Sequence, residues 1–304
     1  SMTMSDFREF ARIAKSDIVI EFTDQFGWLF SRHHYIPAPD MGSGGEEMVR
    51  IYNATLDPAS VTGKPDGVEG WLPGRAEATG YGVWYATMKD MERKGLAPEQ
   101  CTAAFQGFGK VGMHAARFLY ESGVRVTGIT DLTGGIYDPA GLDIPDVMRH
   151  YVREGCFKGY KARSLTNKRL FGLKVDYLVP AATGHVITKT NADKVGARVV
   201  VEGANMPVTY DAMRILAKRG VEIIPDVYAN AGGVIASNVE YRQALGGMRF
   251  TKEMTFAHIR ERFDAVYEVV SSIMKKGRTM TEATTDIALS RVYQTMLERG
   301  LLSR

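Results

Sequence analysis

A glycine-rich turn constrains the fold of this chain more than any other feature. The segment 107–112 reads Gly-Phe-Gly-Lys-Val-Gly, with a short apolar run, 102–106, before it and a helical pattern, 110–122, after it. Gly107 permits a tight strand-to-helix turn, Gly109 lets the backbone approach a pyrophosphate, and Gly112 allows the helix to pack closely on the strand. Phosphate groups then meet the free N–H groups of the helix N-terminus. The segment therefore predicts a dinucleotide-binding Rossmann domain, with Lys110 and Val111 among the cofactor-binding residues.

An acidic residue ends the next predicted strand. The apolar run 124–130 leads into Asp131, which stands 24 positions after Gly107. A carboxylate at this place accepts hydrogen bonds from the adenosine ribose and repels a 2′-phosphate. Because no arginine closely follows Asp131, the sequence favours NAD over NADP as the cofactor. The competing interpretation is a glycine turn in a flavodoxin-like or other nucleotide-free α/β domain.

Strands and helices alternate through the rest of the chain. Further apolar runs bounded by turn residues predict strands, and apolar residues at helical spacing predict helices. This alternation is typical of a parallel sheet with right-handed crossovers, so we expect an α/β fold. The predicted strands are 175–179, 197–201 and 221–224, and the predicted helices include 76–94, 252–276 and 282–299.

Composition excludes several classes of partner. The 304 residues are 45% hydrophobic, which is enough for two packed domains, and the formal net charge is only +3. We expect no nucleic-acid partner, and the absence of an apolar run of about 18 residues argues against a membrane span. The two cysteines form neither a disulfide framework nor a zinc site, and no metal is expected. A cytoplasmic location is the default expectation.

Four further segments carry a resemblance to a known family. In order and spacing around the glycine turn, they are similar to segments of the glutamate/leucine/phenylalanine/valine dehydrogenases, and the resemblance runs from about Ile36 to the C-terminus. It implies an NAD-dependent oxidoreductase that transfers a hydride from a small substrate, an amino acid or a related compound, and that forms a homodimer or a higher homo-oligomer. The segments are 37–40 (PAPD), 74–80 (GRAEATG), 201–207 (VEGANMP) and 225–234 (PDVYANAGGV).

The resemblance also implies roles for individual residues. Asp40 matches the aspartate that moves protons to and from the substrate amine and the attacking water, work that suits a carboxylate beside a cation. Arg75 and Thr79 match positions beside the nicotinamide. Asn205 and Asn230 match residues that bond the nicotinamide ribose and carboxamide, where an amide offers both donor and acceptor. The alternative for each is an ordinary capping, turn, surface or helix residue.

Three more positions follow from the same resemblance. Ala181 and Ala182 lie where a strand end passes under the cofactor, and packing is their expected contribution. Ser237 matches a position that, in the glutamate-using members, touches the side-chain carboxylate of the substrate. The alternative for Ser237 is an ordinary helix serine.

The chain departs from the family pattern before the PAPD segment. Family members carry there a glycine-rich, lysine-bearing segment whose lysines hold the α-carboxylate and activate water, and this chain has no such segment; Lys64 does not match the catalytic lysine. An N-terminally shortened relative is therefore expected. Two alternatives to an amino acid dehydrogenase follow: a non-catalytic or regulatory NAD-binding relative, or an enzyme acting on a substrate that is not an amino acid.

We expect two domains from this pattern. Residues 2–73 with the C-terminal helices 271–304 form a reduced substrate domain, and residues 74–270 form the NAD-binding domain. The predicted fold is thus a Rossmann-type, doubly wound parallel sheet with a second, reduced N-terminal α/β domain. A cleft between the domains would hold the nicotinamide against the substrate, and its closure would exclude water.

Overall fold

The computed structural model describes residues 4–40, 42–275 and 277–302, and these divide into two compact units. The first unit comprises the chain up to Ala78 together with Val234–His258. The second comprises Thr79–Gly233 and the chain from Ile259 onwards. The predicted domain limits at residues 2 and 304 lie outside the described residues.

The second unit is built on a seven-stranded sheet with the order β4-β3-β2-β1-β5-β6-β7. The five strands β2, β1, β5, β6 and β7 are parallel, whereas β3 and β4 form an antiparallel extension beyond β2. The α/β fold class is therefore confirmed. The strands are β1 (Thr102–Gln106), β2 (Arg125–Asp131), β3 (Gly134–Tyr137), β4 (Arg163–Leu165), β5 (Tyr177–Pro180), β6 (Val199–Val201) and β7 (Glu222–Ile224).

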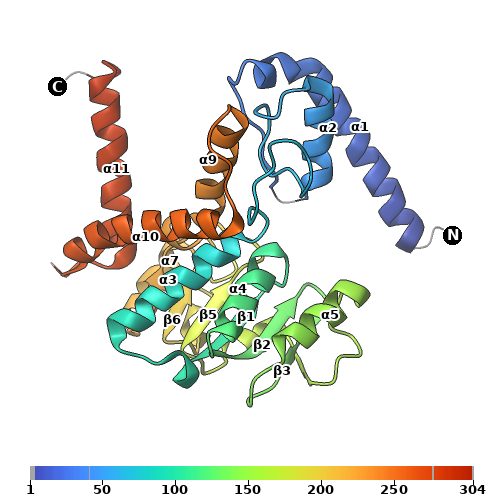
Figure 1. Cartoon of the computed structure of the whole chain (residues 1–304). Helices are drawn as coiled ribbons and strands as arrows, with labels where there is room; N and C mark the ends of the chain where they lie inside the picture. The colour runs from blue at the N-terminus through green and yellow to red at the C-terminus, as the bar shows by residue number, and fades with distance from the viewer. Residues whose placement is uncertain (1–3, 41, 276, 303–304) are drawn as a thin grey trace. The chain divides into compact units, whose positions relative to one another are not determined.

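Helices connect the strands and cover the sheet (Figure 1). The inner parallel strands are buried, as is typical of parallel strands covered by helices: Phe105, Ile129, Leu178 and Val200 are at most 1% exposed. The helices of this unit are α3 (Ala78–Lys94), α4 (Lys110–Glu121), α5 (Ile144–Glu154), α6 (Asn167–Phe171), α7 (Tyr210–Lys218), α8 (Asp226–Ala229), most of α10 (Lys252–Met274) and α11 (Met280–Glu298), with 3-10 turns at Pro98–Gln100 and Ala192–Lys194.

The first unit has a small core of its own. It contains α1 (Met4–Ser31), α2 (Gly45–Thr55), the loop between α2 and α3, and most of α9 (Gly232–Ala244). Phe30 of α1 packs with Met48 and Ile51 of α2 and with Val61 of the loop, and each of these side chains is at most 4% exposed. In the described part of this unit no strand is formed, so the expected second α/β domain is helical there.

The division into units also differs from the expected one at α9 and at the C-terminal helices. Residues 234–258 join the first unit, because Glu240 of α9 forms an ion pair with Lys64 in the loop. The chain from Ile259 belongs to the second unit, where α11 contacts β7. The helical pattern predicts the helices at 252–276 and 282–299 but not α9, and it does not show which unit each helix packs against.

Candidate functional site

The glycine turn in the second unit leaves no space for a side chain at its first position. Gly107 has φ +98°, and its N–H donates to the carbonyl oxygen of Thr130 at 2.7 Å. A Cβ atom on Gly107 would lie 2.8 Å from the Cβ of Ala182 and 2.9 Å from the carbonyl carbon of Ala181. The two alanines therefore pack against the turn.

The other two glycines differ in what surrounds them. Gly109 is the N-cap of α4, and a Cβ added there would meet no atom within 4 Å. A Cβ on Gly112 would collide with the carbonyl oxygen of Gly107. Open space thus lies beside Gly109 at the start of the helix, while Gly112 lets α4 approach the turn. Lys110 and Val111 occupy the first two positions of α4.

This turn lies at the topological switch point of the sheet. From β1 the chain passes first to β2 on one side, and the later strand β5 pairs with β1 on the other side. The N–H of Ala181, just after β5, donates to the carbonyl oxygen of Gln106 at 2.7 Å. Ligands of open α/β sheets bind outside the carboxyl ends of strands at such a point, so the arrangement fits a dinucleotide.

Asp131 ends β2 and is half-buried in a hairpin turn. Its Oδ1 accepts from the backbone N–H of Thr133 at 2.7 Å, from the Thr133 hydroxyl at 2.7 Å and from the Gly134 N–H at 3.1 Å. Besides the ribose-binding role expected from the sequence, Asp131 thus has a local role in the turn. One carboxylate oxygen shapes the β2–β3 turn.

Two predicted asparagines meet in the second unit. The side-chain amide of Asn230 donates to the side-chain oxygen of Asn205 at 2.8 Å. Asn205 follows β6, and Asn230 is the C-cap of α8. Thr79 of α3 lies elsewhere in this unit, against Gly233, where a Cβ would strike its hydroxyl.

A buried carboxylate supports the Asn205 loop. Glu202 follows β6, is 1% exposed, and accepts a hydrogen bond from the N–H of Asp226 at 3.0 Å. Burial, together with the nearby Asp226 carboxylate, raises the pKa of Glu202 to about 7, although the hydrogen bond from the Asp226 backbone opposes this. Asp226 in turn accepts from the N–H of Met206 at 2.8 Å. Glu202 and Asp226 therefore tie the loop carrying Asn205 to the helix that ends at Asn230.

In the first unit, the PAPD segment runs beside the loop that precedes α3. The N–H of Thr62 donates to the carbonyl oxygen of Pro37 at 2.9 Å, and the ring of Pro39 fills the space where a side chain on Gly63 would lie. The carbonyl oxygen of Asp40 accepts from the Ser43 N–H at 3.0 Å. These contacts fix the backbone that carries the exposed Asp40.

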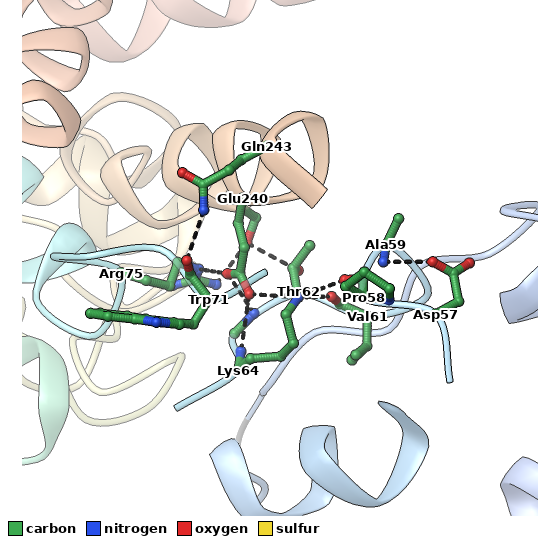
Figure 2. A network of polar contacts seen from close by, with 12 residues as sticks. Asp57, Pro58, Ala59, Val61, Thr62, Lys64, Trp71, Arg75, Glu240 and Gln243 are labelled. Carbon is green, nitrogen blue, oxygen red and sulfur yellow. Dashed lines mark hydrogen bonds and ion pairs between the residues drawn. The ribbon is translucent and has the colours of Figure 1, made fainter. Parts of the chain in front are cut away.

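The same loop contains a buried ion cluster, drawn in Figure 2. The Lys64 ammonium lies 2.9 Å from Glu240 and also donates to the carbonyl oxygens of Pro58 at 2.8 Å and Val61 at 2.7 Å. An ammonium has three N–H donors, so all of them are used. Lys64 is therefore a structural cation and does not supply a free ammonium to a substrate.

Arg75 completes this cluster. Its Nε lies 3.7 Å from Glu240, and its Nη2 donates to the Ser237 hydroxyl at 2.7 Å. The Thr62 hydroxyl also lies 3.4 Å from Ser237. Burial lowers the pKa of Arg75 from its ordinary value, and the charge of Glu240 opposes that effect. Since one carboxylate faces two cations, the cluster has a net positive charge next to the Ser237 hydroxyl.

A sequence model of the Glutamate/Leucine/Phenylalanine/Valine dehydrogenase family matches residues 70–300. The chain belongs to this family. Membership makes it an oxidoreductase of the amino acid dehydrogenase type that works with a nicotinamide cofactor, which confirms the resemblance found in the sequence.

The chain is also similar to individual proteins named glutamate dehydrogenase. NAD-specific glutamate dehydrogenase A of Halobacterium salinarum is 35% identical over 301 residues, and glutamate dehydrogenase A2 of the same organism is 38% identical over 275 residues. The match covers 97% of this chain and 69% of the first relative, and 88% of this chain and 66% of the second. The chain thus spans about two thirds of the length of these dehydrogenases.

Solved structures of the family share the fold. A hetero-hexameric glutamate dehydrogenase from Thermus thermophilus, in a leucine-bound form, superposes with a TM-score of 0.87 at 28% identity, covering 94% of this chain and 69% of that one. Glutamate dehydrogenase from Peptoniphilus asaccharolyticus gives a TM-score of 0.73 at 26% identity, covering 88% and 66%.

Some residues of the ion cluster in the first unit have no clear sequence signal. Glu240 lies on α9, a helix that the sequence analysis does not predict, and its partner Lys64 is 176 positions away. A glutamate is rarely buried unless it is paired. The spacing of Ser237 and Glu240 by three residues puts both on one face of α9, which is the one available hint.

Two kinds of feature are absent from residues 4–40, 42–275 and 277–302. That part of the chain contains no helix long and apolar enough to cross a membrane. It contains no group of three or more His, Cys, Asp or Glu residues arranged to hold a metal ion.

Proposed function

We propose that this dehydrogenase oxidises an amino acid with an anionic side chain, glutamate or a close analogue, using NAD. The observation that carries the proposal is the hydrogen bond from Arg75 to Ser237 at 2.7 Å, with the buried Glu240 lying 3.7 Å from the same arginine. A guanidinium and a hydroxyl held together can donate to one carboxylate, and charged partners strengthen such hydrogen bonds. The relatives named glutamate dehydrogenase support the same substrate class.

The dinucleotide is proposed to bind at the glycine turn. Open space beside Gly109 and the first N–H groups of α4 suit a pyrophosphate, and Asp131 would bond the adenosine ribose with the carboxylate oxygen that the turn does not use. The preference for NAD over NADP rests on this carboxylate and on the relative named NAD-specific. Thr79, Asn205 and Asn230 would hold the nicotinamide end.

Asp40 is the proposed proton-transfer residue. Oxidation removes a hydride from the α-carbon and a proton from the amine, giving an imine that water converts to a keto acid and ammonium. Asp40 would accept a proton first from the amine and then from the attacking water. Its backbone segment is held by hydrogen bonds, so its carboxylate can remain close to both groups. Bound NAD supplies the hydride acceptor.

Oligomerisation is proposed as well. The Thermus thermophilus relative is a hetero-hexamer, and several large apolar side chains of α11 are exposed here, at 64% for Leu289, 58% for Val292 and 55% for Tyr293. Such a stripe on one helix is typical of a surface that another subunit covers. The oligomeric mass in solution, measured by light scattering, tests this: a purely monomeric protein at micromolar concentration contradicts it.

The function is tested by following NADH formation at 340 nm with a panel of glutamate, leucine, phenylalanine and valine, each with NAD and with NADP. The proposal predicts the highest kcat/KM with glutamate and NAD. Equal rates with leucine and glutamate would contradict the role of Arg75 and Ser237. NAD binding without turnover of any amino acid would favour the non-catalytic relative instead.

A further inference from the structure

The second unit contains a cavity of about 450 Å³ at the free edge of its sheet. β7 is the last strand of the sheet and pairs only with β6, and the cavity lies between β7, α7, the end of α10 and the first turn of α11. This volume is within the range of cavities that hold small organic molecules. None of the residues expected to bind the cofactor lines it.

The interior of this cavity, which we call the β7-edge cavity, is largely apolar. Met213 of α7, Ile223 of β7, Met274 of α10 and Met280 of α11 contribute to its lining. Methionines adapt their shape at low cost, so this lining suits an apolar group of moderate size better than a rigid polar one.

Two acidic groups of the lining, Asp90 and Glu222, are paired with cations. Arg93 lies 2.6 Å from Asp90 and 2.5 Å from Glu222, and Lys94 lies 2.8 Å and 3.0 Å from the same two carboxylates. Each acid therefore has two cationic partners, and this pair of acids does not require a cationic ligand.

The first turn of α11 is occupied as well. Glu282 accepts from the Thr279 N–H at 2.9 Å, while the Thr279 hydroxyl accepts from the Glu282 N–H at 3.2 Å, which forms a capping box. Arg278 forms an ion pair with Asp286 at 2.5 Å. An anion at this helix end would meet the Glu282 carboxylate and be repelled.

Arg214 differs from the other cations of the lining. It is an exposed residue of α7, and within residues 4–40, 42–275 and 277–302 its side chain has neither an ion pair nor a hydrogen bond. A guanidinium can bond a carboxylate through two parallel N–H groups. The cavity thus combines an apolar interior with one uncommitted cation.

We propose that the β7-edge cavity is a binding site for a small monocarboxylic acid with an apolar body, whose carboxylate is held by Arg214. The apolar chain would lie among the methionines and Ile223. This site is separate from the residues proposed to bind NAD and glutamate, so it does not depend on the proposed function.

Octanoate is a suitable probe, used below its micelle-forming concentration, with 1-octanol as the neutral ligand of matched length. Titration of the purified full chain by isothermal calorimetry or by ligand-observed NMR gives both affinities. The proposal predicts saturable binding of octanoate with one site per chain, and binding of 1-octanol that is weaker by about tenfold or more. Equal affinities, or no binding of octanoate, would overturn it.

Two variants locate the site. Arg214→Met removes the charge from an exposed position without breaking an ion pair or a side-chain hydrogen bond, so we expect the fold to be retained and octanoate affinity to fall about tenfold. Lys218→Met, one turn further along α7 and outside the cavity lining, is the matched control and should keep wild-type affinity. Ala217→Trp places a large side chain in the cavity and should abolish binding. If Arg214→Met and Ala217→Trp both bind octanoate like the wild type, the site lies elsewhere and the proposal is wrong.

Discussion

The ammonium group of Lys64 lies 2.9 Å from a carboxylate oxygen of Glu240, and neither side chain is exposed. The contact joins the loop before α3 to α9, and the backbone N–H groups of Gly63 and Lys64 also donate to the same carboxylate, at 2.8 Å and 3.1 Å. Ser237, one turn earlier on α9, and Arg75, at the end of the loop, meet as a consequence.

Glu240→Gln is expected to destabilise the protein strongly. Two cations would remain buried with a neutral amide, and removing one partner of a buried ion pair costs about 3–5 kcal/mol in the free energy of unfolding. Urea denaturation measures this cost. The double variant Lys64→Met with Glu240→Gln should recover part of the lost free energy of unfolding, because it also removes the buried ammonium that no longer has a carboxylate partner.

Glu154→Gln is the matched control for that experiment. Glu154 pairs with Arg153 at 2.6 Å on the surface, where both side chains are well exposed, so the stability should hardly change. An unchanged unfolding free energy in Glu240→Gln would show that the buried pair does not hold the loop to α9.

Replacing Gly112 and Gly109 by alanine, one at a time, should distinguish an effect on stability from an effect on NAD affinity. Gly112→Ala forces a Cβ against the Gly107 carbonyl, so thermal unfolding should show a loss of about 1–3 kcal/mol. Gly109→Ala meets no atom and keeps an allowed φ of −75°, so stability should be retained. Its methyl group would occupy the proposed pyrophosphate space, so NAD affinity, measured by fluorescence titration, should fall at least about tenfold. Wild-type NAD affinity in Gly109→Ala would place the pyrophosphate elsewhere.

Glu202 should make the stability fall as the pH rises. Its pKa is raised to about 7 in the folded chain, whereas the ordinary value is 4.5, so the folded state binds more protons between these values. The contribution of Glu202 is therefore fully present below about pH 4.5 and is lost as the pH rises towards 7, by about 3 kcal/mol at most. Unfolding free energies from pH 5 to pH 8 test this, with Glu202→Gln expected to flatten the slope. The same slope in both proteins would exclude Glu202 as its source.

Ser237→Ala should alter substrate selectivity more than stability. The variant removes a hydroxyl that Arg75 now orients, so the KM for glutamate should rise by about tenfold while the KM for NAD stays unchanged. Steady-state kinetics with each substrate varied in turn gives both constants. Parallel rises in both KM values would indicate a general disturbance of the first unit.

The sequence predicted the parallel part of the sheet well and the remainder poorly. β1 begins and ends where the apolar run does, because Gly107 stops it, and α4 follows the glycine turn as expected. The antiparallel strands β3 and β4 have four and three residues, too few for a period to be recognised, and β3 begins with two glycines. The order and position of the motifs were enough to identify the family, because five matched segments in the same order are far more specific than any one of them.

The partners of the site residues depend on tertiary contacts. The resemblance points to both Asn205 and Asn230, but their pairing depends on the fold, which brings the loop after β6 next to the end of α8. For Arg75 the resemblance implies a place beside the nicotinamide, whereas its contacts in the structure are to Ser237 and Glu240. One sequence does not show which helix face a loop arginine will reach.

The central claim is that Asp40 moves protons during the oxidation of an amino acid by NAD. The most direct test compares Asp40→Asn with the wild type for glutamate-dependent NADH formation, with NAD affinity measured on the same samples. We expect the rate of NADH formation in Asp40→Asn to be lower than the wild-type rate by a factor of about 10² or more, with unchanged NAD affinity. A variant that forms NADH as fast as the wild type would contradict it.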